Sequence, residues 1–180
     1  MKKKLPIGLS IVIALVLVAF GLLYGTWAGF QEDLEDVQSI LTMENGLMDV
    51  LGYRAADGFN LCAVASRHLS ADAAELSALR AAAEALRDAK DLNACKAADD
   101  ALSQSAAAIS ARLQETQSFQ LSQRDQSYLA MLTADLNNLS TSAAVNTYND
   151  AASDFNRKLN APLSGALGKL LGMEACPLYE

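Results

Sequence analysis

The chain has 180 residues, a length that suits one domain with an anchor better than two full domains. Apolar residues make up 52% of it but aromatic residues only 6%, which is typical of helices that pack through small and aliphatic side chains. The net charge is −7, and the only charges in the first 30 residues are three lysines, so residues 31–180 carry −10. Because nucleic-acid binding requires Lys and Arg to neutralise phosphates, we expect no DNA or RNA partner.

The first predicted element is a membrane anchor. No charge occurs from Leu5 to Phe30, and the 21 residues of Ile7–Trp27 are enough to cross the ~30 Å hydrocarbon core as a helix. A cleaved signal peptide has a shorter apolar region, of about 7–15 residues, followed by a small-x-small cleavage site. Trp27 breaks that pattern, and Tyr24 and Trp27 suit the membrane interface. The sequence therefore predicts an uncleaved signal anchor in contact with membrane lipid.

The charges beside this segment predict its orientation. Lys2, Lys3 and Lys4 precede it, and a cluster of acidic residues begins at Glu32. Since basic residues stay on the cytoplasmic side, we expect a single-pass protein of the cell membrane with a cytoplasmic N-terminus. The predicted division is residues 1–30 as Lys-rich tip and anchor, and residues 31–180 as an extracytoplasmic helical-bundle domain.

Helical periodicity continues through the rest of the chain. Apolar residues recur every three or four positions from Leu34 to Leu51, in the pattern of one helix face. Over residues 71–117 the stripe is interrupted near Asp91, so this segment is either two helices or one kinked helix. Ser70 and Asp125 are candidate helix caps. A third long helix is predicted to end before Pro162, and a short one at Gly172.

The expected fold class is therefore all-α. A transmembrane helix precedes an antiparallel bundle of three long segments, or four if the middle one is split, plus a short C-terminal helix. Two doublets, Tyr148-Asn149 and Phe155-Asn156, lie seven residues apart in the third segment. Their spacing predicts that each aromatic ring is buried. Each asparagine would then lie at the core edge, where its amide can reach a backbone group of a neighbouring element.

These doublets carry a resemblance to a known family. "YNDAASDFN" followed by Pro162, "LLGM" and "LYE" resembles the C-terminal signature of the LemA family, and "RAADGFNL" at 54–61 resembles a second family segment. The chain departs from the family pattern at Tyr53, Phe59 and Ala161, so it resembles a divergent member. The resemblance implies a single-pass membrane protein with a helical bundle, no established molecular activity and no agreed catalytic residues. The matching residues, interpreted as structural, are Arg54, Asn60, Leu61, Tyr148, Asn149, Phe155, Asn156, Pro162 and Gly172.

Candidates for chemistry are few. His68 is the only histidine, expected to cap a helix or contact solvent, and Asp99 and Asp100 are expected to be acids on a helix surface. The three cysteines include no CxxC pair, so we expect no metal site, no cofactor and no catalytic residues. If the helices run antiparallel, Cys95 would lie about 28 Å from Cys62, too far for a disulfide. Any bridge should then join Cys62 to Cys176, although a four-helix path would separate those two as well.

Two functions remain open on these grounds. The first is a non-catalytic, membrane-anchored helical domain that binds protein partners at the bacterial cell envelope. The alternative is a structural protein that self-assembles into oligomers or filaments through its helices. A small-ligand site near Asn149 and Asn156 comes third.

Overall fold

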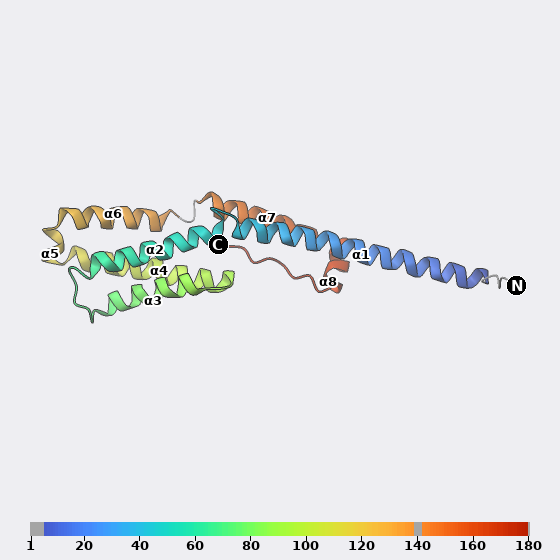
Figure 1. Ribbon diagram of the computed structural model, residues 1–180, viewed down its shortest axis with the longest axis horizontal. Helices are drawn as coiled ribbons and strands as arrows, with labels where there is room; N and C mark the ends of the chain where they lie inside the picture. Colours follow the sequence, from blue (N-terminus) through green and yellow to red (C-terminus); the bar gives the residue numbers. More distant parts are fainter. Residues whose placement is uncertain (1–5, 139–141, 180) are drawn as a thin grey trace. The chain divides into compact units, whose positions relative to one another are not determined.

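The computed structural model describes residues 6–138 and 142–179. Throughout these ranges the chain is helical or irregular, without a β-strand, which confirms the all-α prediction. The helices are α1 (Ile7–Thr42), α2 (Leu47–Ala65), α3 (Ala74–Asp88), α4 (Leu92–Gln114), α5 (Gln117–Gln120), α6 (Gln123–Asn137), α7 (Ala143–Leu159) and α8 (Ser164–Leu170) (Figure 1).

The chain divides into two compact units. Unit 1 comprises the described parts of Met1–Ser39 and Ala151–Cys176, and unit 2 those of Ile40–Asp150 and Pro177–Glu180. The boundary predicted at residue 30 falls within α1 and within unit 1. The division into a 1–30 anchor and a 31–180 domain stays a prediction.

A sharp turn separates α1 from α2, where the sequence suggested an unbroken helical stripe. Asn45 has a φ of 60°, a left-handed conformation that asparagine tolerates better than most residues. At Gly46 an added Cβ would lie only 2.7 Å from the carbonyl oxygen of Met43. The chain can therefore turn here because a small residue follows a permissive one.

The middle segment is two helices, α3 and α4, which settles the alternative left open by the sequence. Asp91 caps α4, because its side chain accepts a hydrogen bond from the backbone N–H of Ala94 at 2.9 Å. The cap expected at Ser70 is wrong, since α3 begins only at Ala74. The third segment is also divided, into α6 and α7. Ser122, and not Asp125, caps α6.

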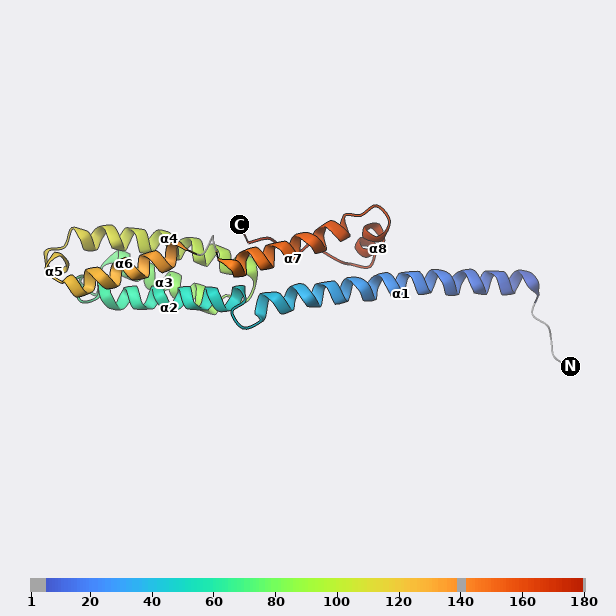
Figure 2. The same ribbon diagram turned by 90° about the horizontal axis from the view of Figure 1, so that it is seen from above.

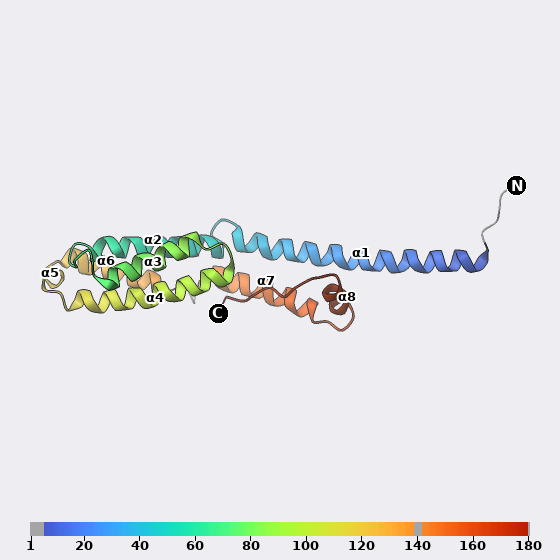
Figure 3. The ribbon, with the colours of Figure 1, turned by 90° about the horizontal axis from the view of Figure 1, so that it is seen from below.

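Unit 2 is a bundle in which α2 packs against α3, α4 and α6 (Figures 1 and 3). Gly58 on α2 permits the closest approach, because an added Cβ would lie 2.7 Å from a methyl group of Leu102 and 3.0 Å from the Cβ of Ala83. Fully buried aliphatic side chains from the helices fill the interior, namely Leu47, Leu51, Leu61, Leu79, Leu102, Ile109 and Leu113.

Unit 1 forms around two aromatic rings. Phe30 of α1 packs edge-on against Phe155 of α7, with ring centroids 6.0 Å apart. Gly168 of α8 lies so close to Phe30 that an added Cβ would approach the ring within 2.7 Å. After α8 the chain turns at Gly172, whose φ is +84°, and runs back beside α7 without regular structure (Figure 2).

The first part of α1 is exposed and apolar. No side chain between Ile7 and Gly29 is buried, and the most apolar 18-residue window has a mean hydropathy of 2.7. Within the described residues this is the one helix long and apolar enough to cross a membrane, which is compatible with an anchor. Gly21, Gly25 and Gly29 recur every four residues, and apart from the neighbouring backbone of α1 itself, no described atom lies within 4 Å of a Cβ added at any of them.

Candidate functional site

The most polar part of the interior of unit 2 is an ion pair between α2 and α4. Arg54 and Asp99 are 5% and 6% exposed, and Arg54 Nε donates to Asp99 Oδ1 at 2.6 Å. The same guanidinium donates to Ser103 Oγ at 2.9 Å and to the carbonyl oxygen of Leu136 on α6. Burying a charged pair is favourable only when its remaining hydrogen-bonding groups are also satisfied. Arg54 meets that condition by joining three helices.

Tyr179 supplies the other contact of this pair. Its ring is buried, and its hydroxyl donates to Asp99 Oδ2 at 2.8 Å. Burial and then the hydrogen bond to the Asp99 carboxylate raise the pKa of Tyr179, so the phenol stays protonated and remains a donor. A residue far along the chain thus completes the hydrogen bonding of a carboxylate on α4.

The backbone around Tyr179 is held by the first of the two doublets. Asn149 Nδ2 donates to the carbonyl oxygen of Tyr179, and the backbone N–H of Tyr179 donates to Asn149 Oδ1, both at 2.8 Å. Tyr148 Oη donates to the carbonyl oxygen of Pro177, also at 2.8 Å. The amide of Asn149 therefore pairs with one residue as a neighbouring β-strand would.

The second doublet makes the same contact within unit 1. Asn156 Nδ2 donates to the carbonyl oxygen of Cys176 and Asn156 Oδ1 accepts from its N–H, both at 2.8 Å. Seven helical residues rise by about 10.5 Å and three extended residues by about 10 Å. The heptad spacing of the asparagines therefore matches the spacing of Cys176 and Tyr179, which accounts for the repeated doublet.

A groove of about 420 Å³ lies beside the buried pair in unit 2. Its wall includes Arg54, Asp99, Asn149 and Tyr179, and its remaining lining is mostly polar, including Lys96, Asp100, Asn137 and Asn146. Amides, one ammonium group and carboxylates together suit a polar or peptide-like ligand better than an apolar cofactor.

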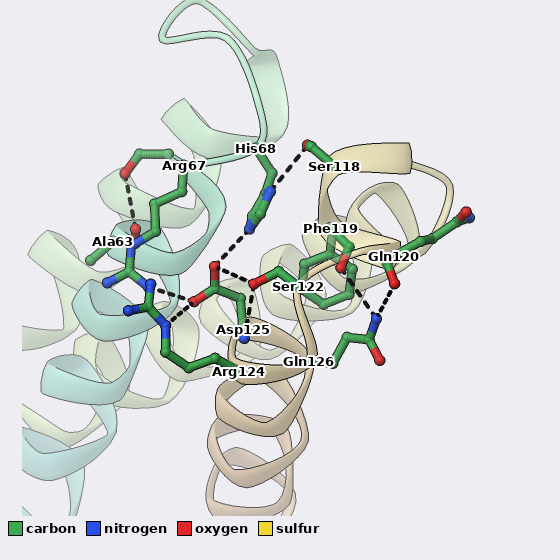
Figure 4. A network of polar contacts seen from close by, with 11 residues as sticks. Ala63, Arg67, His68, Ser118, Phe119, Gln120, Ser122, Arg124, Asp125 and Gln126 are labelled. Atoms are coloured by element: carbon green, nitrogen blue, oxygen red, sulfur yellow. Dashed lines mark hydrogen bonds and ion pairs between the residues drawn. The ribbon is translucent and has the colours of Figure 1, made fainter.

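A second polar cluster joins α2 to the start of α6 (Figure 4). His68 Nε2 lies 2.9 Å from Asp125 Oδ2, and His68 Nδ1 lies 3.1 Å from Ser118 Oγ. Arg67 and Arg124 lie 2.6 and 3.3 Å from the other oxygen of Asp125. The hydrogen bond from His68, helped by those from Ser122 and Arg67, lowers the pKa of Asp125 to about 2.

This cluster corrects the expectation for His68. Its side chain is only 7% exposed and lies within hydrogen-bonding distance of two side chains, so it neither caps a helix nor faces solvent. The order serine, histidine, aspartate is that of a nucleophilic triad. Here, however, Asp125 also pairs with Arg67 and Arg124, and the ring of Phe119 packs edge-on against His68 at 5.4 Å. These contacts give the cluster a structural role, in which it links the chain just after α2 to α5 and α6.

The predicted residues fall into four groups. Arg54 and Asn149 line the groove of unit 2, and Tyr148 and Asn156 hold the segment after α8. Leu61 and Phe155 are buried in the cores of their units. The remaining ones have no part in the groove: Asn60 and Pro162 are exposed, and Gly172 forms the turn after α8.

The cysteines do not form a bridge in the structure. All three are free thiols, with Cys62 and Cys95 buried and Cys176 half-buried. Burial raises the pKa of each thiol and so disfavours the reactive thiolate. The pairing of Cys62 with Cys176 stays a prediction.

The groove residues that sequence reasoning missed include the two that hydrogen-bond to each other, Asp99 and Tyr179. Asp99 was expected on a helix surface and is buried, whereas Asp100 is exposed. The signal was present, because Asp99 lies four residues after Cys95 and three before Leu102 on the apolar stripe. Nothing local in the sequence indicates that Tyr179 would reach Asp99.

Outside the groove, the four-residue spacing of Gly21, Gly25 and Gly29 in α1 was also readable from the sequence.

Among the described residues, no group of three or more His, Cys, Asp or Glu side chains is placed to hold a metal ion. Comparison with protein-family models, with curated proteins and with solved structures found no match to this chain. The resemblance to the LemA family therefore stays a prediction, and function has to be argued from the contacts above.

Proposed function

We propose that this chain is a membrane-anchored, non-catalytic helical protein of the bacterial cell envelope, whose helical domain binds protein partners; the LemA resemblance implies the anchor and the helical bundle but no activity. The observation that carries the proposal is the exposed apolar part of α1. Burying one Val, Leu, Ile or Phe side chain gains about 1.5–3 kcal/mol, and this stretch exposes more than ten of them. A bilayer would bury these side chains together.

The dimensions of α1 support the proposed membrane position. The 21 residues Ile7–Trp27 rise by about 32 Å, close to the hydrocarbon thickness of a bilayer. The helix continues to Thr42, so the acidic residues that begin at Glu32 would lie beyond the interface. With lysines before the helix and acids after it, the proposed orientation places the N-terminus in the cytoplasm and the domain outside.

The internal contacts of unit 2 favour binding over catalysis. In the described part of the chain, every buried side-chain nitrogen or oxygen has a hydrogen-bond partner. The two buried carboxylates, Asp99 and Asp125, are engaged by Arg54, Tyr179 and His68 with its neighbours. A general acid or base needs its group available to a substrate, and these groups hold the bundle together.

The test is extraction of the full chain from bacterial membranes at alkaline pH. We expect the wild-type chain to stay in the membrane pellet in carbonate, and protease added to spheroplasts to digest its C-terminal domain. The matched control carries Leu15→Arg and Val16→Arg, each costing about 2.5–3.5 kcal/mol at the centre of a span. We expect that control to be lost from the pellet. Carbonate extraction of the wild type would refute the anchor, and full protection of its domain would reverse the orientation.

A second candidate function, self-assembly, is favoured by one observation. Gly21, Gly25 and Gly29 form a stripe of small residues on the exposed α1, a pattern that lets two membrane helices approach closely. Energy transfer between labelled copies in lipid bilayers should fall when Gly25 is replaced by Leu. It should persist when the neighbouring Leu22 is replaced by Ile. Equal transfer in the wild type and the Gly25→Leu variant would exclude association through this stripe.

A further inference from the structure

Unit 2 holds residues 177–179 in the way that a binding site holds a separate peptide. Tyr148 and Asn149 recognise only the main chain of this segment, at Pro177 and Tyr179. Asp99 recognises one side chain, through the hydroxyl of Tyr179. Three hydrogen bonds to the backbone and one to a phenol define both a direction and a residue type.

The segment is separable from the helices that hold it. Residues 173–179 belong to no helix, and they follow Gly172, whose positive φ ends the preceding turn. Leu178, between the two recognised residues, is 37% exposed. Since residues 177–179 take no part in the hydrogen bonds of any helix, they can leave their site without the loss of a helical hydrogen bond.

The site retains a preference for tyrosine when the segment leaves. Asp99 Oδ1 would keep its bond from Arg54, but Asp99 Oδ2 would lose the phenolic donor. With the segment gone, Asp99 Oδ2 faces the groove, and a hydrogen bond from a hydroxyl to a charged group is worth more than one to a neutral group, so the free site favours any chain that returns a hydroxyl to this position. Phenylalanine would fill the same space without supplying the hydrogen bond.

We propose that Asp99, Tyr148 and Asn149 form a binding site for an extended peptide that carries a tyrosine two residues after the residue whose carbonyl Tyr148 binds, and that residues 177–179 of a second copy exchange with the chain's own segment. The contacts are identical in the exchanged and unexchanged states, so exchange costs only the entropy of association. Copies anchored in one membrane meet at high effective concentration, which lowers that cost. The exchange between copies rests on the proposed membrane anchoring, whereas the peptide site itself does not.

Peptide binding is tested first, with the full anchored chain shortened after Gly172 and purified in detergent. The probe is a fluorescent peptide of residues 173–180. We expect saturable binding, at least about tenfold weaker for the same peptide with Tyr179→Phe, because a hydrogen bond to a charged group is lost. The matched receptor control carries Asn149→Ala and should also bind more weakly. If the shortened chain is helical but binds the two peptides equally, or binds neither, the site is refuted.

A second variant covers the case in which the shortened chain does not fold. A protease site is inserted after Gly172 in the full chain, which is cut after purification. The released segment should stay bound and be replaced slowly by the labelled peptide. Immediate loss of the segment with no uptake of the peptide would also refute the site.

Exchange between copies is tested by photo-crosslinking in membranes. The receptor copy is shortened after Gly172, and the donor copy carries Asn149→Ala and a photoreactive residue in place of Leu178. We expect a donor–receptor adduct that disappears when the receptor also carries Asn149→Ala. Peptide binding without this adduct, in membranes where both copies resist carbonate, would refute exchange alone. Loss of carbonate resistance would instead refute the proposed anchoring and leave the peptide result standing.

Discussion

Removing only the positive partner of the buried ion pair should destabilise the protein strongly. In Arg54→Ala, the carboxylate of Asp99 would remain buried while still accepting a hydrogen bond from the Tyr179 hydroxyl. Removing one partner of a buried pair costs about 3–5 kcal/mol, because the other charge is left uncompensated. For a chain of this size, about 3 °C per kcal/mol converts that cost into a fall in Tm of about 9–15 °C.

The assay is thermal unfolding of the full chain in detergent, followed by circular dichroism. The matched control is Arg157→Ala, because Arg157 pairs with Asp154 at 2.9 Å but both side chains are more than half exposed. The control should not shift Tm resolvably, since exposed ion pairs contribute little. The double variant Arg54→Ala with Asp99→Ala should lose less than the sum of the two single variants. A fall for Arg54→Ala no larger than for Arg157→Ala would show that burial of the pair has been misjudged.

Three further outcomes follow from the structure. Gly58→Ala should lower the free energy of unfolding in urea by about 1–3 kcal/mol, because its Cβ would lie 2.7 Å from a leucine methyl group. Gly52→Ala has open space around it and should raise the free energy of unfolding by about 0.5–1 kcal/mol. A change of the same sign in both variants would contradict the packing around Gly58. The pKa of Asp125 is lowered from 3.8 to about 2, so its ionised form stabilises the fold above about pH 4, and that contribution is lost as pH falls through 2. Asp125→Asn should therefore be less stable than the wild type at neutral pH, with a gap that closes by about pH 2 in thermal scans. Buried Cys62 and Cys95 should react with iodoacetamide at pH 8 only after denaturation, as mass spectrometry can check; rapid labelling of the native chain would contradict their burial.

The helical architecture was largely readable from the sequence because it depends on local periodicity. The three- and four-residue recurrence of apolar side chains predicts helices wherever it continues, and Pro162 lies just beyond the end of α7. The breaks were harder to place. The turn at Asn45 depends on a single left-handed residue, and the start of α6 depends on a reciprocal contact between Ser122 and Asp125.

Only a small part of the groove was predictable from the sequence, for a different reason. Arg54 and Asn149 were singled out by a resemblance in sequence, and the spacing of the doublets indicated a buried ring beside an edge amide. Asp99 and Tyr179 are 80 residues apart, and their contact depends on the path of the chain after α8. A pattern within one helix carries no information about which distant segment will lie against it.

The way in which Asn149 and Asn156 hold the chain has a consequence for how this region can vary. Both amides contact only main-chain atoms, at Tyr179 and Cys176. Natural variants could therefore change residue 175 or 178 freely, provided that the tyrosine is kept. An insertion or deletion of a single amino acid between positions 176 and 179 would change the spacing of the two residues that the asparagines bind. Only one of the two asparagines could then keep its hydrogen bonds. Length in this stretch is thus under tighter constraint than chemical identity.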